Sequence, residues 1–375
     1  MKLFCLLLLF GLFPAAIQEI TNLDKPCAAD PANMWLDIVL VVDNSKTMTS
    51  LNLDRISASI VDLFSKTRIG THYDDPRSTR VALVTYNRDA KVVADLDHFQ
   101  SFRDLYQTTN AALSNVADSI ESNLALGLQT AQLIFLSGRS NGVRSNYKKV
   151  VIIYTALYPT IETTDPFKVI EYLKARKAEI MIADMSGTSK LANYFNNMTL
   201  PRDTAIYLPG MASRLKDGLL NINCFCKPFW INFLSDDYYS SGSCLRVTED
   251  TASWSSARLA CQNSDPNGYL VNEFSEDKHN FVQFLTGNQD YHIGLTYLKD
   301  SWYWQQPMGQ PLLPVNDKDY KFWRSGYPTA ETINTVVANV VDDNLKDGWQ
   351  NINEYGEYKH YVCETHACDT DNYCP

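Results

Sequence analysis

Apolar and polar positions follow one pattern in the first half of the chain. From residue 35 to 222, continuous apolar runs alternate with stretches whose apolar residues recur every three or four positions. Strands that are apolar on both faces and separated by helices predict a mostly parallel sheet covered on both sides. The region is therefore predicted to be a three-layer α/β domain. Its expected strands are 36–43, 80–86, 90–96, 148–155 and 179–185, and its expected helices are 54–67, 119–136 and 165–177.

The pattern changes at Cys224. Residues 226–365 are rich in Trp, Tyr, Asn and Gly, and they contain two short helical stretches at about 252–262 and 275–285. Short strands follow, with a long irregular stretch at roughly 299–335. A loop of that length is uncommon unless it is functional or held by crosslinks. We therefore expect a second domain of the α+β class.

The first residues indicate the compartment. Lys2, an apolar run and the small pair Ala15 and Ala16 are typical of a secretory signal, which we place at residues 1–18. No later stretch reaches the about 18 apolar residues of a spanning helix, so the mature protein is expected to be secreted, extracellular and not membrane-spanning. The net charge of −10 argues against nucleic acid or an anionic membrane as a partner.

Cysteine usage supports an extracellular location. Of nine cysteines, Cys5 lies in the signal segment, and an even number remains, which predicts disulfides without fixing their pairing. A zinc site is disfavoured, because the spacing of Cys224 and Cys226 is wrong and no His/Cys cluster completes it. The remaining cysteines are Cys27, Cys224, Cys226, Cys244, Cys261, Cys363, Cys368 and Cys374.

An enzyme is not expected. Residues 138–142 fit the Gly-x-Ser-x-Gly nucleophile elbow, but they follow a helical stretch and precede a strand, which is the reverse of the context that motif needs. The six histidines are scattered and show no catalytic or metalloprotease spacing.

Two families are recognisable from these residues. VLVVDNSKT at 39–47, RVALVTYNRDAKV at 80–92 and NLALGLQTAQLIF at 123–135 resemble a von Willebrand factor type A domain, which we place at 30–222. TASWSSARLACQ, HIGL, FWRSGYP and DGWQN resemble a C-type lectin-like domain, which we place at 226–366, with a short tail at 367–375. In this order behind a signal peptide, they resemble secreted proteins of nematodes.

The resemblance also implies a disulfide pattern. In lectin-like domains the first-helix cysteine pairs with the last-strand cysteine, which implies Cys261–Cys363 here, and an N-terminal hairpin pair would be Cys226–Cys244. The resemblance further suggests Cys27–Cys224 across the ends of the A domain and Cys368–Cys374 in the tail, where a disulfide-bearing segment is expected.

Asp43, Ser45 and Thr47 place three oxygen side chains at alternate positions after a buried strand. They could cap the next helix or face a hard cation. The resemblance implies the A-domain metal site, with Ser122 from a second loop. In the third loop Thr155 stands where the family has Asp. With a single carboxylate, the site is expected to bind Mg or Ca weakly or to remain a metal-free hydroxyl cluster. No cofactor is predicted with certainty.

The lectin-like half departs further from its family. Tyr327-Pro328-Thr329 and Trp349-Gln350-Asn351 align with the two triplets of calcium-dependent sugar binding, yet they contain no carboxylate. Tyr327, Thr329, Gln350 and Asn351 are therefore predicted to contact ligand without calcium. Asn197 begins an Asn-Met-Thr glycosylation acceptor.

The resemblance implies a non-enzymatic recognition protein. Its expected partners are extracellular proteins or glycans, including those of microbial surfaces in innate defence. Metal-dependent adhesion through the A domain and a role as an extracellular matrix protein are the alternatives.

Overall fold

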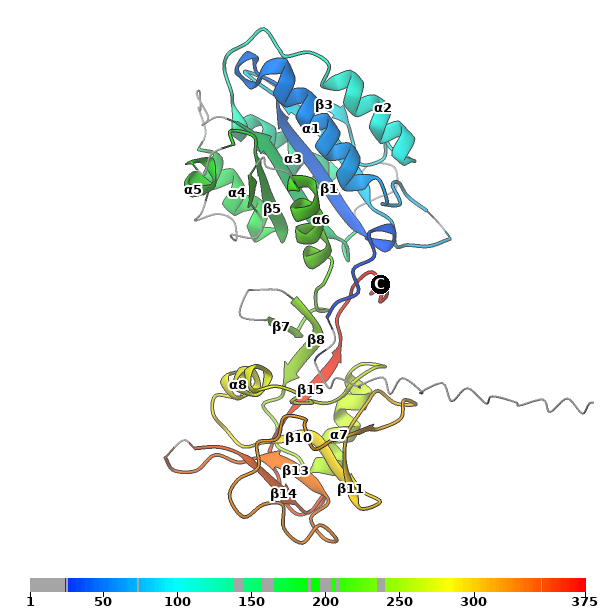
Figure 1. Ribbon diagram of the computed structural model, residues 1–375, viewed down its shortest axis with the longest axis vertical. Helices are drawn as coiled ribbons and strands as arrows, with labels where there is room; N and C mark the ends of the chain where they lie inside the picture. Colours follow the sequence, from blue (N-terminus) through cyan, green and yellow to red (C-terminus); the bar gives the residue numbers. More distant parts are fainter. Residues whose placement is uncertain are drawn as a thin grey trace, which may run out of the picture.

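The computed structural model shows two domains stacked along one axis, with a narrow junction between them that contains the C-terminus (Figure 1). The first domain runs from β1 to α6 and the second from β7 to β15. The structure describes residues 24, 26–72, 74–137, 144–156, 165–187, 190–195, 204–206, 210–234, 240–344 and 346–375. The predicted signal segment and Asn197 lie outside the described residues.

The first domain contains a six-stranded sheet in the order β3-β2-β1-β4-β5-β6. All neighbouring strands are parallel except β2 and β3, which pair antiparallel. Every residue of the central strand β1 and of its neighbour β2 is buried, as continuous apolar runs predict. The strands are β1 (Leu36–Asp43), β2 (Arg80–Tyr86), β3 (Ala90–Ala94), β4 (Lys148–Thr155), β5 (Ala178–Asp184) and β6 (Thr204–Ile206).

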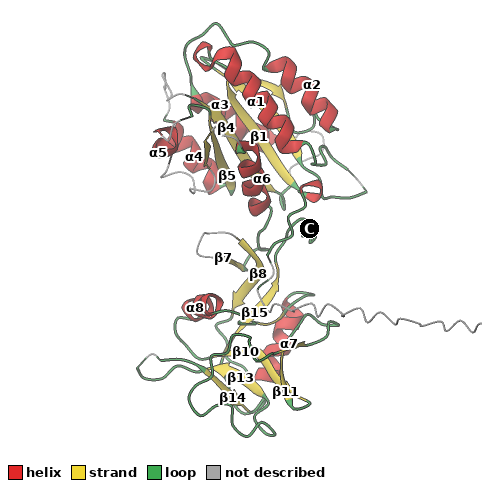
Figure 2. Ribbon diagram, in the orientation of Figure 1, coloured by secondary structure: helices red, strands yellow, loops and turns green. Residues whose placement is uncertain are grey.

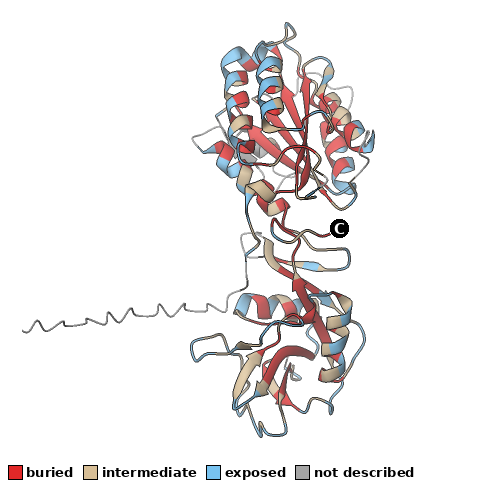
Figure 3. Ribbon diagram, turned by 90° about the vertical axis from the view of Figure 1, so that its right-hand side faces the viewer, coloured by how far each residue is buried: buried red, intermediate tan, exposed pale blue. Residues whose placement is uncertain are grey.

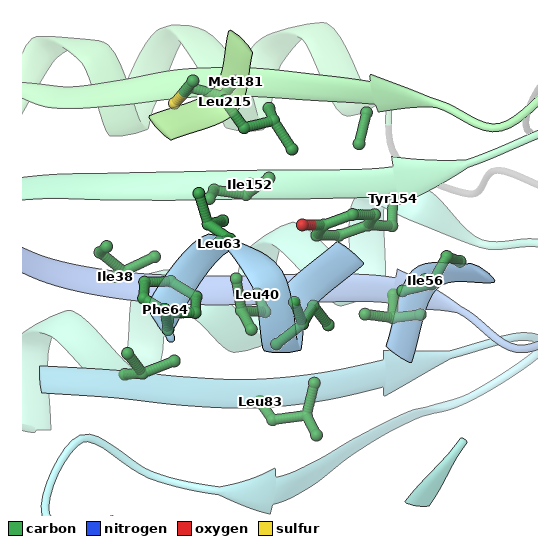
Figure 4. Close-up of a cluster of buried hydrophobic side chains, with 14 of the residues drawn as sticks. Ile38, Leu40, Ile56, Leu63, Phe64, Leu83, Ile152, Tyr154, Met181 and Leu215 are labelled. Atoms are coloured by element: carbon green, nitrogen blue, oxygen red, sulfur yellow. The ribbon is translucent and has the colours of Figure 1, made fainter. Parts of the chain in front are cut away.

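Helices cover both faces of this sheet, so the predicted three-layer fold is confirmed (Figure 2). Ile38 and Leu40 of β1 pack with Leu63 and Phe64 of α1 (Figure 4), while alternate residues of the same strand pack against α3. α1 (Thr49–Phe64), α2 (Phe102–Ala112) and α6 (Met211–Ile222) lie on one face, and α3 (Leu124–Ser137), α4 (Pro166–Ala175) and α5 (Lys190–Phe195) lie on the other.

The second domain has the predicted α+β character. Its two helices are α7 (Trp254–Ser264) and α8 (Glu276–Leu285), close to the predicted stretches, and each begins at a serine that accepts a backbone N–H bond. The central path of the sheet is β12-β11-β10-β15-β8-β7. Off this path, β13 pairs with β10, β14 pairs with β13, and β9 pairs with β15. The strands are β7 (Ile231–Leu234), β8 (Ser240–Val247), β9 (Tyr269–Leu270), β10 (Tyr291–Leu298), β11 (Ser301–Trp304), β12 (Leu313–Pro314), β13 (Val336–Asn339), β14 (Trp349–Ile352) and β15 (His360–His366).

Four disulfides join the eight cysteines of the described residues. Cys261–Cys363 ties α7 to β15 inside the second domain, across a sequence separation of 102 residues. The other three pairs lie at or near the junction between the domains: Cys27–Cys224, Cys226–Cys244 and Cys368–Cys374. Both ends of the described chain are thus fastened close to the point where the domains meet.

The junction is built around the fully buried Trp35, the last residue before β1. Its indole Nε1 donates to the carbonyl oxygen of Asp369 at 2.7 Å, and its backbone N–H donates to Asn223 at 2.7 Å. The ring contacts Tyr147, Phe225 and Tyr373, which come from three separate parts of the chain. In Figure 3, several residues at this narrow point between the two domains are coloured as buried. The C-terminal tail therefore returns to pack against the first domain.

Candidate functional site

Polar residues gather where the strands of the first domain end. β1 ends at Asp43, and its parallel neighbour β4 ends at Thr155. Val42 pairs with Tyr154, so the next residues, Asp43 and Thr155, lie side by side. Thr155 in turn pairs with Asp184, the last residue of β5. Open parallel sheets place ligand sites at this carboxyl edge.

The structure brings the four predicted metal-site residues together. The Asp43 carboxylate accepts a bond from the backbone N–H of Ser45 at 2.8 Å and from the Ser122 hydroxyl at 2.8 Å. The hydroxyls of Ser45 and Thr47 lie 2.8 Å apart. Burial raises the pKa of the Asp43 carboxyl, and these hydrogen bonds offset part of that shift.

Backbone hydrogen bonds hold the two loops of this cluster in place. Lys46 N–H donates to the carbonyl of Ser119 at 2.8 Å, and Ala117 N–H donates to the carbonyl of Asn44 at 2.8 Å. Ser122 is therefore positioned by the first loop even though it lies 79 residues further along the chain.

The alternative reading, a helix cap, does not describe this loop. Ser45 is the N-cap residue of the short 3-10 helix at Lys46–Met48, but its side chain makes no capping hydrogen bond. Met48 is the N-cap residue of α1, and its side chain makes no capping hydrogen bond either. The oxygens of Asp43, Ser45 and Thr47 bond within the cluster instead.

The residues present are compatible with a divalent cation. The cluster offers a carboxylate and three hydroxyls, the hard oxygen donors that magnesium and calcium prefer. Nearby, the Oδ2 atom of the fully buried Asp184 has no hydrogen-bond partner, which is unusual for a buried charged group. In the described part of the chain, no three His, Cys, Asp or Glu side chains converge as a metal site. Any cation here would therefore rely on hydroxyls and at most two carboxylates.

A second candidate surface lies at the long loop of the second domain. The Tyr327–Pro328 peptide bond is cis. Thr329 N–H donates to Oδ1 of Asn351 at 2.7 Å, while the Asn351 amide NH₂ donates to the carbonyls of Asn334, at 3.0 Å, and Thr329. Asn351, 2% exposed, is therefore used within the protein to hold the loop against β14. Thr329 is exposed, and Tyr327 and Gln350 are half-buried.

A buried charged cluster lies beneath β14 in the same domain. His279 has its Nδ1 atom 2.8 Å from Glu273 and its Nε2 atom 2.8 Å from Asp347. Glu273 also accepts from the indole of Trp349 at 2.7 Å and from the hydroxyl of Tyr291 at 2.6 Å. Burial lowers the pKa of His279, but the two carboxylates outweigh burial and raise it to about 9. No sequence pattern indicates this cluster, because its members lie up to 76 residues apart.

The stability of the second domain should therefore fall in alkaline solution. His279 has an ordinary pKa of 6.5 when unfolded and about 9 when folded, so its stabilising charge is fully present below 6.5 and is lost as the pH rises through about 9. The shift corresponds to roughly 3 kcal/mol at most. Urea unfolding between pH 6 and pH 10 measures this loss. His279→Gln should flatten that part of the profile, whereas the exposed His98→Gln should not; an equal fall in His279→Gln would assign the effect to other groups.

The comparisons with known proteins agree with both halves of this architecture. The family model of the von Willebrand factor type A domain matches residues 37–208, and that of the C-type lectin domain matches residues 250–365. The chain therefore belongs to the proteins that combine a von Willebrand factor type A domain with a following C-type lectin domain. We refer to the two halves below as the A domain and the lectin domain.

Individual relatives share one or both domains. C-type lectin domain-containing protein 160 of Caenorhabditis elegans is 28% identical over 378 residues, which cover 93% of this chain and 56% of that protein. The chain thus spans about half the length of that relative. Mouse lithostathine-1 is 31% identical over 129 residues, 33% of this chain and 73% of its own. Proximal thread matrix protein 1 from the mussel byssus aligns with a TM-score of 0.43 and 18% identity, covering 52% of this chain and 47% of its own.

No helix in the described ranges is long and apolar enough to cross a membrane. The combination of domains supports a recognition or adhesion protein.

Proposed function

We propose that this is a secreted, non-enzymatic recognition protein whose lectin domain binds glycan or protein ligands without calcium. The observation that carries the proposal is the bonding of Asn351. The amide of Asn351 hydrogen-bonds to the backbone of Thr329 and Asn334, so direct bonds hold the long loop in place. In family members that bind sugar through calcium, the triplets aligned with these residues bind the ion. A loop fixed in this way needs no metal to present its surface.

The exposed part of that loop has suitable chemistry for a ligand. Tyr327 offers a half-buried aromatic ring, Thr329 an exposed hydroxyl and Ile333 an exposed apolar side chain, and Gln350 of β14 is half-buried. An aromatic face can stack on a sugar ring or on an apolar side chain, while the polar groups fix its orientation. The acidic net charge disfavours anionic polymers as ligands. The proposed partners are extracellular, including microbial surfaces, and the proposed role is innate defence.

A screen of glycans and bacterial surfaces, with and without EDTA, tests the proposal. Binding through the lectin domain should persist in EDTA and should weaken about tenfold in Tyr327→Ala, a loss of roughly 1.4 kcal/mol. Tyr106→Ala, which removes a partly exposed tyrosine from α2 of the A domain, is the matched control and should bind normally. Binding that EDTA abolishes, or that ignores Tyr327, would show that the lectin domain does not work in this way.

Metal-dependent adhesion through the A domain is the second candidate function. The Asp43 cluster favours it, because a bound cation there could accept an acidic group of a partner. In the same screen this function would appear as binding that EDTA removes and that Tyr327→Ala leaves intact. A role in extracellular matrix would be a setting for either kind of binding.

A further inference from the structure

Asp184 is the most unusual buried acid in the A domain. It is the last residue of β5 and is 0% exposed. Its Oδ1 atom accepts bonds from the backbone N–H of Ser186, at 2.8 Å, and from the Ser186 hydroxyl. Its Oδ2 atom is buried and has no hydrogen-bond partner. A buried carboxylate normally has all of its oxygens paired, so the free oxygen calls for an explanation.

The sheet register places Asp184 in line with the Asp43 cluster. Val42 pairs with Tyr154, so Asp43 lies beside Thr155, and Thr155 pairs with Asp184. Side chains at matching positions of parallel strands point to the same face of a sheet. That face is the one lined by Val41, Ile153 and Ile182. Asp43 and Asp184 are thus two strands apart on one face, with Thr155 between them.

The spacing suits an ion that both acids help to hold. Adjacent strands lie about 4.8 Å apart, so the two Cα atoms are roughly 10 Å apart. Cation–oxygen bonds of about 2.0–2.6 Å to each acid, with a bridging water for the more distant one, can span most of that distance. Thr155, which is 1% exposed, occupies the strand position between the two acids.

We infer that Asp184 supplies the second carboxylate of a divalent-cation site formed with Asp43, Ser45, Thr47 and Ser122. The negative charge that Thr155 cannot provide comes from the next strand of the sheet. Asp184 acts through its free oxygen, directly or through water. This assignment concerns the A domain alone and is independent of how the lectin domain binds its ligand.

Titration calorimetry with Mn²⁺ and with Mg²⁺ on the full chain tests this assignment. The wild type should bind one ion with a dissociation constant of about 10⁻⁴–10⁻³ M. Asp184→Asn removes the charge but keeps the shape, and it should weaken binding at least tenfold. Glu179→Gln, on the same strand outside the cluster, is the matched control and should bind as the wild type does. Asp43→Ala should abolish binding.

A rescue variant separates charge from structure. Thr155→Asp added to Asp184→Asn moves the second carboxylate one strand closer to Asp43 and should restore binding to the wild-type level or better. If Asp184→Asn does not fold, judged by circular dichroism, Asp184→Ser is the second variant and should show the same loss. Wild-type protein that binds no Mn²⁺ at 10 mM (about ten times the weakest expected constant), or a folded Asp184 variant that binds as the wild type does, overturns the inference.

Discussion

Lys278→Met is expected to destabilise the lectin domain by about 3–5 kcal/mol. Lys278 is 0% exposed, and its ammonium lies 2.7 Å from Glu364 and bonds to Asp24. Burial lowers the pKa of Lys278, but these two carboxylates outweigh burial and raise it, so the lysine is charged in the folded protein. Methionine would fill most of the volume while leaving the buried Glu364 and the partly buried Asp24 without their cation.

Urea unfolding at pH 7 measures this effect. Lys346→Met, at an exposed lysine of the same domain, is the control and should change stability by less than about 0.5 kcal/mol. The double variant Lys278→Met/Glu364→Gln should recover part of the loss, since one of the unpaired charges has been removed. If the free energy of unfolding of Lys278→Met lies within about 1 kcal/mol of the wild-type value, the ion pairs of Lys278 make no net contribution to stability.

Removing the Cys261–Cys363 disulfide, as the double variant Cys261→Ser/Cys363→Ser, is expected to have an effect of similar size. The bond closes a loop with a sequence separation of 102 residues, for which the chain-entropy estimate is about 4.7 kcal/mol. Both cysteines are buried between α7 and β15, so the serines would also leave hydroxyls in an apolar cluster. The lectin domain should then unfold at much lower urea concentration, and the yield of secreted protein should fall.

The tail disulfide provides the comparison. Cys368–Cys374 has a sequence separation of only 6 residues, and the same estimate for its loss is about 2 kcal/mol. The double serine variant at that pair should be clearly more stable than the one at Cys261 and Cys363. Equal effects would contradict the dependence on loop length, and a stability close to the wild type without the Cys261–Cys363 bond would mean that the link between α7 and β15 is dispensable.

The fold could be predicted because the spacing of apolar residues along the chain differs between the two domains. Continuous apolar runs such as Ile38 to Val42 are typical of strands buried on both faces, and the structure confirms a parallel core. The prediction omitted α2, α5, α6 and β6. α2 is an amphipathic helix with few buried residues, and α5 and β6 have six and three residues, which is too short for periodicity to reveal. α6 is a longer amphipathic helix with a buried apolar face, so its spacing could have identified it.

The candidate sites were less predictable from the sequence, because they depend on register and on side-chain bonding. Asp184 stands at the end of a predicted strand, but only the pairing of Thr155 with Asp184 places it in line with Asp43. Asn351 was identified by its position in a family triplet, and the sequence could not show that its amide is occupied by Thr329 and Asn334. Likewise, nothing near Lys278 in the sequence identifies Asp24 as its partner, 254 residues away.

The junction at Trp35 lies between the two proposed binding sites and sets their separation. β1 leaves the junction at Leu36 and ends at Asp43, on the side of the sheet away from the lectin domain, whereas β13 and β14 lie at the opposite end of the molecule (Figure 1). The indole of Trp35 donates to Asp369 and its backbone N–H donates to Asn223, and these buried bonds favour a stiff spacer over a hinge at the junction. One molecule would therefore hold its two ligands apart, so it is suited to bridging separate surfaces and not to gripping a single surface with both domains.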